Sequence, residues 1–296
     1  MHQYLRSIGF SCFEGKEEEV EKLLKKMEKE FSPYARRFAE RDGMVHAEIR
    51  GNVNYYMGIC LSGYLNSKGK FVRQAYYPFF LPDETVKSEE AGIGMMDVSV
   101  DGSTYYTLIE GLKTGISLTA HMDNPFEYAF RSSDEFDPRT KVVLAGFSQN
   151  GYVLLPARDE ADMKDCREGY NYDVTAMMEP FCEDVCDAEK VQAAALESLS
   201  KLASIDRRLG SEDIYSIVST LCMPEVYESQ IYFIIGIIEE VSLTVNEDTN
   251  EGIFKLKLFV NGVTMYVMIN EEDLIGEPIV GRRFKGPIWL TSHVIF

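Results

Sequence analysis

The sequence predicts an α+β protein: a mostly antiparallel N-terminal β-sheet with covering helices, followed by a small C-terminal β-barrel. Residues 43–156 hold short segments rich in β-branched and aromatic residues, separated by turns too short for helical crossovers. Helical patterns are confined to residues 17–31 and 187–224, so helices and strands are segregated along the chain. From residue 231 onward the pattern returns to strands.

The clearest helix is EEEVEKLLKKMEKEF, residues 17–31. Its apolar residues recur three and four positions apart, which places them on one face: Val20, Leu23, Leu24, Met27 and Phe31. Pro33 ends the helix because proline has no amide hydrogen to donate. The charged opposite face is expected to be solvated.

The N-terminal sheet is expected to have about eight strands. Asn150-Gly151 favours a tight hairpin between its last two strands. Two stretches that begin at Gly43 and Gly94 share a Gly-Met start, a later glycine and a Tyr-Tyr pair, which raises the question of a duplicated β-meander.

Two helices are expected after an acidic connection. Residues 159–189 carry eleven acidic and two basic side chains, which is typical of a solvated surface segment. The other interpretation is a contact surface for a cation or a basic partner. Asp187 can cap a helix that ends near Gly210, and Ser211 opens a second helix that closes at Pro224. The predicted domains are residues 1–226, the α+β domain, and residues 227–296, the barrel.

The barrel prediction rests on the order of elements. One long strand, Ile231–Val245, is expected to bend at Gly236, and Asn261-Gly262 predicts a hairpin between the next two strands. Asn270 can cap a single helical turn, and two last strands are expected at residues 278–284 and 286–296. Three strands, a short helix and two strands is the order of an OB-like barrel.

The stretch VGRRFKGPIWL, residues 280–290, contains three basic residues and the only tryptophan of the chain. The structural interpretation is that Trp289 fills the barrel interior or its end, while the charged side chains lie mainly at the surface. The functional interpretation is a binding face for an acidic protein segment or a short oligomer. Its candidate residues are Arg282, Arg283, Lys285 and Trp289.

Most recognisable catalytic motifs are absent from the sequence: it has neither a phosphate-binding P-loop nor a nucleophile elbow. No cofactor is expected. The four histidines do not cluster with the cysteines, so no metal site is expected either. The scattered cysteines are expected to be reduced thiols: Cys12, Cys60, Cys166, Cys182, Cys186 and Cys222.

Residues 119–125, TAHMDNP, are the strongest candidate for chemistry. His121 could act as a base oriented by Asp123, and Glu110 or Asp97 could supply a second acid. The structural interpretation is that Asp-Asn-Pro initiates a turn and His121 is a partly buried histidine. An enzyme with a pocket around these residues is the alternative hypothesis.

The charge balance limits the partners. The formal net charge is −18, and residues 228–296 hold five basic against ten acidic side chains, which argues against binding a nucleic acid. The longest apolar run, residues 231–238, is far shorter than the roughly 20 residues of a membrane span, and no secretory signal is evident. We therefore expect a cytoplasmic protein.

Both ends of the chain resemble a known family. MHQYLRSIGFS at residues 1–11 and INEEDLIGEPIVGRRFKGPIWL at residues 269–290 resemble a family of unknown function from anaerobic Gram-positive bacteria of the Clostridia type. The resemblance spans essentially the whole chain and implies a bacterial protein, but it brings no activity or catalytic residue with it. The expected function is non-enzymatic binding of another protein or a short oligomer through the C-terminal barrel.

Overall fold

The computed structural model describes residues 3–39, 45–83, 85–98, 105–112, 117–131, 140–157, 214–226 and 230–296. These residues are mostly β-strand with few helices, which confirms the predicted α+β class. Within residues 1–154 and 220–296, the described residues form one compact unit. The acidic segment 159–189 and the helix predicted to end at Gly210 lie outside the described residues.

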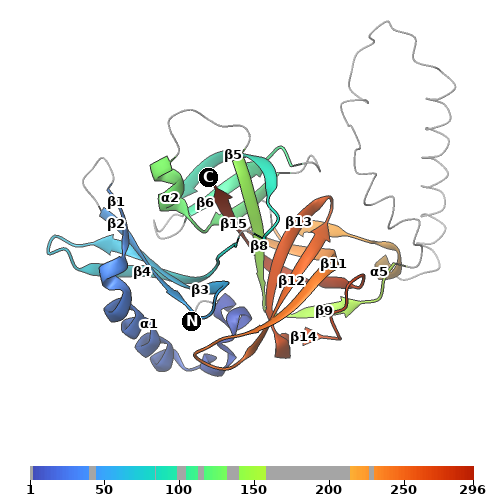
Figure 1. Cartoon of the computed structure of the whole chain (residues 1–296), viewed down its shortest axis with the longest axis horizontal. Helices are drawn as coiled ribbons and strands as arrows, with labels where there is room; N and C mark the ends of the chain where they lie inside the picture. Colours follow the sequence, from blue (N-terminus) through green and yellow to red (C-terminus); the bar gives the residue numbers. More distant parts are fainter. Residues whose placement is uncertain are drawn as a thin grey trace, which may run out of the picture. The chain divides into compact units, whose positions relative to one another are not determined.

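The first sheet, as far as the structure describes the chain, has four antiparallel strands in chain order. They are β1 (Arg36–Ala39), β2 (Val45–Asn52), β3 (Met57–Leu65) and β4 (Phe71–Phe80). Helix α1 (Glu17–Phe31) has the bounds that the sequence predicts, and it lies along one face of this sheet (Figure 1). Its buried residues Val20, Leu24 and Met27 pack against that face, where Gly51 leaves room for the Met27 side chain. The other face is therefore left for a different set of side chains.

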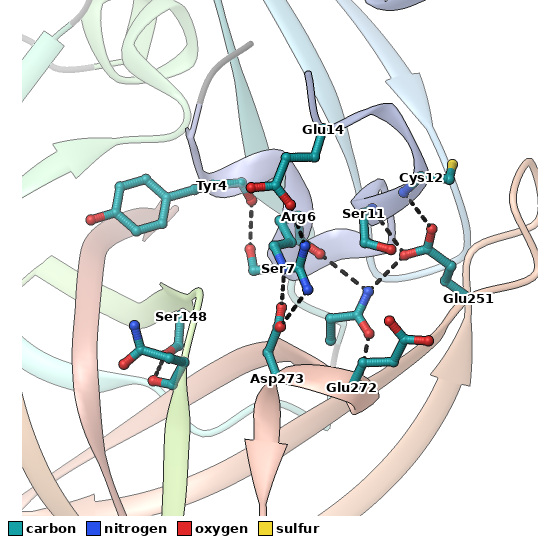
Figure 2. Close-up of polar contacts among 12 residues, drawn as sticks. Tyr4, Arg6, Ser7, Ser11, Cys12, Glu14, Ser148, Glu251, Glu272 and Asp273 are labelled. Atoms are coloured by element: carbon teal, nitrogen blue, oxygen red, sulfur yellow. Dashed lines mark hydrogen bonds and ion pairs between the residues drawn. The ribbon is translucent and has the colours of Figure 1, made fainter. Parts of the chain in front are cut away.

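The N-terminal segment lies between the two sheets and is held by polar contacts. It forms the short 3-10 helices η1 (Gln3–Ile8) and η2 (Ser11–Phe13), and a third, η3 (Ser32–Tyr34), follows α1. The carboxylate of Glu251 accepts the backbone N–H groups of Ser11 and Cys12, each at 3.0 Å (Figure 2). Asn246 donates to the carbonyl of Ile8 at 2.8 Å. The start of the chain is thus attached to strands that lie more than 200 residues later.

Within the described residues, the second sheet has eleven strands. The first five are β5 (Glu89–Val98), β6 (Tyr105–Glu110), β7 (Leu118–Met122), β8 (Thr140–Ser148) and β9 (Gly151–Leu154). The other six are β10 (Leu221–Pro224), β11 (Ile231–Val245), β12 (Gly252–Val260), β13 (Val263–Asn270), β14 (Leu274–Ile275) and β15 (Arg283–Ile295). In the described part of the chain, the remaining helices are α2 (Pro125–Arg131), α5 (Ile214–Ile217) and η5 (Glu271–Asp273). The two stretches that begin at Gly43 and Gly94 lie in different sheets, since the first contains β2 and the second contains the end of β5.

The strand pairings of the second sheet close two rings that share β8 and β15. In one ring, β11, β12 and β13 form an antiparallel meander, β13 runs parallel to β8, β8 is antiparallel to β15, and β15 is antiparallel to β11. In the other ring, β5, β6 and β7 form the meander, β7 runs parallel to β15, and β8 is antiparallel to β5. Each meander has a register shift at the same step, between its first and second strands. The two halves of this sheet therefore repeat one pairing pattern.

The Asn150-Gly151 hairpin prediction is wrong. Strands β8 and β9 are both antiparallel to β15, so the chain continues in one direction through residues 149 and 150. Neither Asn150 nor Gly151 has the positive φ that a tight two-residue hairpin requires. At Asn261-Gly262 both residues do, with φ of 46° and 85°, and the predicted hairpin between β12 and β13 is confirmed.

The prediction of two separate final strands is also wrong, because residues 283–295 form the single strand β15. Pro287 is tolerated in this strand because it falls in a gap between two partners. On the edge of β15 that pairs with β9 and β8, the pairing with β9 ends at Lys285 and the pairing with β8 begins at Leu290, so no carbonyl there needs the N–H that proline lacks. The predicted single turn is confirmed: Asn270 accepts the N–H of Glu272 at 3.0 Å and caps η5.

Strands from both sides of the predicted boundary at residues 226 and 227 share this sheet. From beyond the boundary, β13 pairs with β8, and β15 pairs with β7 and β8. The prediction of a helix that closes at Pro224 is wrong for its last residues, because α5 ends at Ile217. Residues 221–224 instead form β10, an edge strand paired with β11. The long strand predicted for Ile231–Val245 is confirmed, with its irregularity between Ile238 and Glu240 instead of at Gly236.

Two buried clusters follow from the alternation of side chains along β8 and β15. Val142, Leu144, Ile288 and Leu290 face the cluster enclosed by the two rings. Their neighbours in sequence face the opposite cluster, which includes α1 and the first sheet: Val143, Ala145, Phe147 and Trp289. Trp289 therefore lies on the outside of the ring, and the prediction that it fills a barrel interior is wrong.

Candidate functional site

The face of the first sheet that α1 does not cover carries a row of polar side chains. Glu48, Arg50 and Asn52 alternate along β2 with Ala47, Ile49 and Gly51, so the two sets point to opposite faces. Such an alternation is typical of a solvated face. Here Glu48 is 1% exposed, because this face lies against the ends of β7 and β15. Glu48, Arg50 and Asn52 are not among the predicted site residues, although their alternation with apolar residues is visible in the sequence.

Glu48 and Arg50 form the centre of the site. The Arg50 Nε donates to Glu48 Oε1 at 3.0 Å, and the guanidinium of Arg50 lies 5.0 Å from the ring centroid of Phe79. Arg36, directly opposite Glu48 on β1, approaches the same carboxylate at 3.7 Å and keeps half of its side chain exposed. Two guanidinium groups therefore share one carboxylate.

Asp123 joins this cluster from the end of β7. Its backbone carbonyl accepts a hydrogen bond from Arg50 Nη2, and its N–H donates to the carbonyl of Ser292 at 2.8 Å. Thr291 Oγ1 donates to Asp123 Oδ2 at 3.4 Å. Burial raises the pKa of the Asp123 carboxyl to about 8, although Arg50 opposes the shift. The carboxyl is therefore mostly protonated at neutral pH.

His121 is fully buried against aromatic rings. Its ring centroid lies 4.4 Å from that of Tyr77 and 4.9 Å from that of Trp289. Burial also raises the pKa of Cys60 to about 12 and the pKa of Tyr77 well above its usual value. Neither side chain is ionised at neutral pH, so neither is an activated nucleophile or base.

A cavity of about 240 Å³ opens beside Arg50. Its polar lining is Arg36, Glu48, Arg50 and Asn52, and its apolar lining is Tyr34, Phe79 and Leu81. His121 and Asp123 do not line it. Within the described residues, no group of three or more His, Cys, Asp or Glu side chains could hold a metal ion.

Two residues of the predicted acid-and-histidine pocket, His121 and Asp123, are fully buried. Asp123 has Arg50 and Glu48 as charged neighbours, whereas His121 packs against Tyr77 and Trp289. Glu110 lies exposed at the end of β6, away from this cluster. Asp97 belongs to β5, and its side chain is outside the described part of the structure.

The predicted basic face is divided between surface and interior. Arg282 and Lys285 are partly exposed, whereas Arg283 is only 3% exposed and its pKa is lowered by burial. Trp289 is 8% exposed, stacks on Tyr4 at 5.5 Å and donates from Nε1 to Gln230 Oε1 at 3.1 Å. The expectation that all three basic side chains lie mainly at the surface is therefore wrong for Arg283.

Among the described residues, Cys12, Cys60 and Cys222 are free thiols. The other three cysteines lie outside the described residues. No helix in the described part of the chain is long and apolar enough to cross a membrane.

A family model described as "Domain of unknown function, E. rectale Gene description (DUF3881)" matches residues 5–292. The chain belongs to this family. The family resemblance predicted from the two ends of the sequence is thereby confirmed over nearly the whole chain. No curated protein and no solved structure matches the chain. Any activity of this family member must accordingly be argued from its own residues.

Proposed function

We propose that this DUF3881 family member is a non-enzymatic cytoplasmic binding protein that contacts an acidic segment of another protein. The contact surface is formed by β9, β14 and the start of β15, and we name it the β9–β14–β15 surface. It consists of Tyr152, Ile275, Ile279, Val280, Arg282 and Lys285.

The observation that carries the proposal is a row of exposed apolar and basic side chains across three strands. Ile275 is paired with Tyr152, and Tyr152 is paired with Lys285, so the three side chains stand side by side on one face. Tyr152 is 46% exposed and Ile275 61%. Lys285 Nζ lies 5.8 Å from the Tyr152 ring centroid. Exposed apolar area beside cationic groups suits a partner that carries both apolar and acidic side chains.

The adjoining turn adds to this surface. Arg282 donates its backbone N–H to the carbonyl of Ile279 at 3.0 Å, and Gly281 takes a φ of 89° that glycine adopts easily. The turn exposes Ile279 and Val280 beside the Arg282 side chain. Arg283 and Trp289 are buried, so we assign them to the support of this surface and not to contact with the partner.

We also propose that the C-terminal strands form an OB-like barrel in which β8 is the fifth strand. The support is the closed ring of pairings: a three-stranded meander whose third strand runs parallel to one shared strand and whose first strand is antiparallel to the other. The second ring, built on β5, β6 and β7, supports a second barrel of the same topology that shares β8 and β15. Such barrels serve as rigid platforms for binding.

The alternative function, an enzyme with a pocket around His121 and Asp123, has less support. His121 and Asp123 have no exposed surface, and the Asp123 carboxyl is mostly uncharged at neutral pH. A general base must reach its substrate proton within hydrogen-bonding distance, directly or through one water molecule. The cavity presents Arg36 and Arg50 instead of these two residues.

A fluorescent peptide of alternating leucine and glutamate residues tests the binding proposal by anisotropy. The parent protein should bind it, and a double charge reversal, Arg282→Glu with Lys285→Glu, should weaken binding by about tenfold or more. The matched control reverses Lys68 and Lys70, two exposed lysines in the turn between β3 and β4, and should bind like the parent. Higher salt should weaken binding by the parent. Equal binding by both double variants would contradict the proposal, and so would preference for an oligonucleotide of the same charge.

A further inference from the structure

We infer that the cavity between Arg36 and Arg50 is a binding site for a small organic carboxylate. This site is separate from the β9–β14–β15 surface, and it lies on the first sheet. Four observations carry the inference: the fixed guanidinium of Arg50, the half-exposed guanidinium of Arg36, the net charge of the lining, and the apolar wall.

Arg50 is held in place before any ligand arrives. Glu48 accepts from its Nε at 3.0 Å, and the carbonyl of Asp123 accepts from its Nη2. The guanidinium also lies over the ring of Phe79, which fixes its plane. Its Nη1 donates to no other described residue, and Arg50 lines the cavity. A guanidinium with one fixed edge and one open edge is arranged to donate to a ligand oxygen.

Arg36 supplies the second donor. It lies on the neighbouring strand, its Nη1 is 3.7 Å from Glu48 Oε1, and half of its side chain is exposed. A distance of 3.7 Å is too long for a hydrogen bond, so this guanidinium retains donors for another acceptor. An anion that enters the cavity can therefore contact both arginines.

The charge of the lining selects the class of anion. Arg36 and Arg50 contribute two positive charges and Glu48 one negative charge, so the cavity has a net charge of +1 within a chain of −18. Asp123 does not cancel it, because burial raises the pKa of its carboxyl to about 8. A monocarboxylate balances this single charge. A phosphate monoester carries about −1.5 to −2 and leaves an excess of negative charge beside Glu48.

Size and apolar lining define the rest of the ligand. The cavity volume of about 240 Å³ equals the volume of about eight water molecules in the liquid, which suits a ligand with a similar number of heavy atoms. Phe79 and Leu81 form an apolar wall, and Tyr34, 80% exposed, stands at the edge of the lining. A short aromatic or aliphatic body attached to the carboxylate therefore fits.

Benzoate is a suitable probe, and benzamide is its uncharged isostere. We expect saturable binding of benzoate in calorimetry or in a titration followed by amide NMR shifts, with benzamide weaker by about tenfold or more because it lacks the charge. Arg36→Gln should weaken benzoate binding by a similar factor. Arg37→Gln is the matched control: Arg37 is exposed on the same strand, its side chain points to the other face, and its loss should have no effect.

Arg50→Lys keeps the charge and removes the planar fork, so it should also weaken benzoate binding. A thermal melt of each variant separates loss of the site from loss of the fold, and Arg36→Gln is expected to melt like the parent because Arg36 is half exposed. The inference is overturned if benzoate does not saturate, if benzamide binds equally well, or if inorganic phosphate binds in preference to benzoate.

Discussion

Arg6 and Asp273 form a two-pronged ion pair between residues 267 positions apart in the sequence. Arg6 Nε donates to Asp273 Oδ2 and Arg6 Nη2 donates to Asp273 Oδ1, each at 2.7 Å (Figure 2). Glu14 adds a third contact, at 2.5 Å, to the Nη1 of the same guanidinium. The geometry joins η1 to η5, so it fixes the N-terminal segment to the C-terminal strands.

Removal of this pair should measurably destabilise the protein. The pair is bidentate and partly buried, and hydrogen bonds to charged groups contribute about 1.5–3 kcal/mol each. We expect Arg6→Ala to lower the free energy of unfolding by about 1.5–3 kcal/mol, which is the contribution of one such bond, because Arg6 is partly exposed and solvent screens part of the attraction. Arg6→Lys should lower it by less. Lys22→Ala, which breaks an exposed pair with Glu19 on α1, is the control and should cost under about 0.5 kcal/mol. Urea denaturation measures all three, and equal losses for Arg6→Ala and Lys22→Ala would contradict the expectation.

The only tryptophan should contribute to stability through its contacts outside the ring of strands. Trp289 is stacked on Tyr4 and packed against His121 and Phe147. We expect Trp289→Ala to cost about 3–5 kcal/mol of unfolding free energy, and Trp289→Phe to cost less because part of the ring packing remains. Thermal melts of both variants test this. If Trp289→Ala melts like the parent while peptide binding disappears, Trp289 contacts the ligand, and its assignment to the support of the β9–β14–β15 surface is wrong.

Local signals predicted the local structure. The apolar spacing of residues 17–31 predicted α1 to the residue, and Asn261-Gly262 predicted the hairpin, because both depend on short-range geometry. The fifth strand of the C-terminal ring could not be predicted in the same way. It is β8, and nothing in the periodicity of residues 140–148 indicates a parallel partner more than a hundred residues later.

The candidate site was predicted only in part for a similar physical reason. TAHMDNP was recognised because its residue types suggest chemistry, and the structure buries both His121 and Asp123 completely. The alternation of polar and apolar residues around Glu48 and Arg50 is typical of a solvent-exposed strand face. Alternation indicates which side chains share a face, but it does not indicate what covers that face. Their burial results from tertiary packing against the ends of β7 and β15. The same limit applies to Trp289. A strand was predicted at this residue, but the sequence did not show that its side chain points to the cluster outside the ring of strands.

Thiol reactivity should follow burial. Burial raises the pKa of Cys60 and of Cys222 to about 12, whereas Cys12 is exposed. Because the thiolate is the reactive form, we expect iodoacetamide to label Cys12 of the native protein well before Cys60, as followed by peptide mass spectrometry. In the unfolded protein without reductant, all six cysteines should be labelled. A disulfide recovered in stoichiometric amount would contradict the predicted reduced state.

Asp123 and His293 should give the free energy of unfolding an asymmetric dependence on pH. Burial raises the pKa of Asp123 from 3.8 to about 8, and burial together with Arg50 and Arg36 lowers the pKa of His293 from 6.5 to about 3. Folded Asp123 keeps a proton that the unfolded chain releases, so its contribution is complete below pH 3.8 and is lost as the pH rises to about 8. In the folded protein His293 stays neutral at pH values where the unfolded chain protonates it. Its contribution to the free energy of unfolding is therefore lost as the pH falls below 6.5.

Between pH 4 and 6.5, Asp123 lowers and His293 raises the free energy of unfolding as the pH rises, each by about 1.4 kcal/mol per pH unit. The two effects should therefore largely cancel. From pH 6.5 to 8, Asp123 is the one of these two residues whose protonation still differs between the folded and unfolded states. The free energy of unfolding should therefore fall by about 2 kcal/mol over this range. Asp123→Asn should abolish this fall, because the amide does not titrate. Glu110→Gln, which changes an exposed acid, should keep it. Urea denaturation at several pH values measures the slopes. A flat profile for the parent above pH 6.5, or an unchanged slope in Asp123→Asn, would show that the Asp123 carboxyl is ionised in the folded protein.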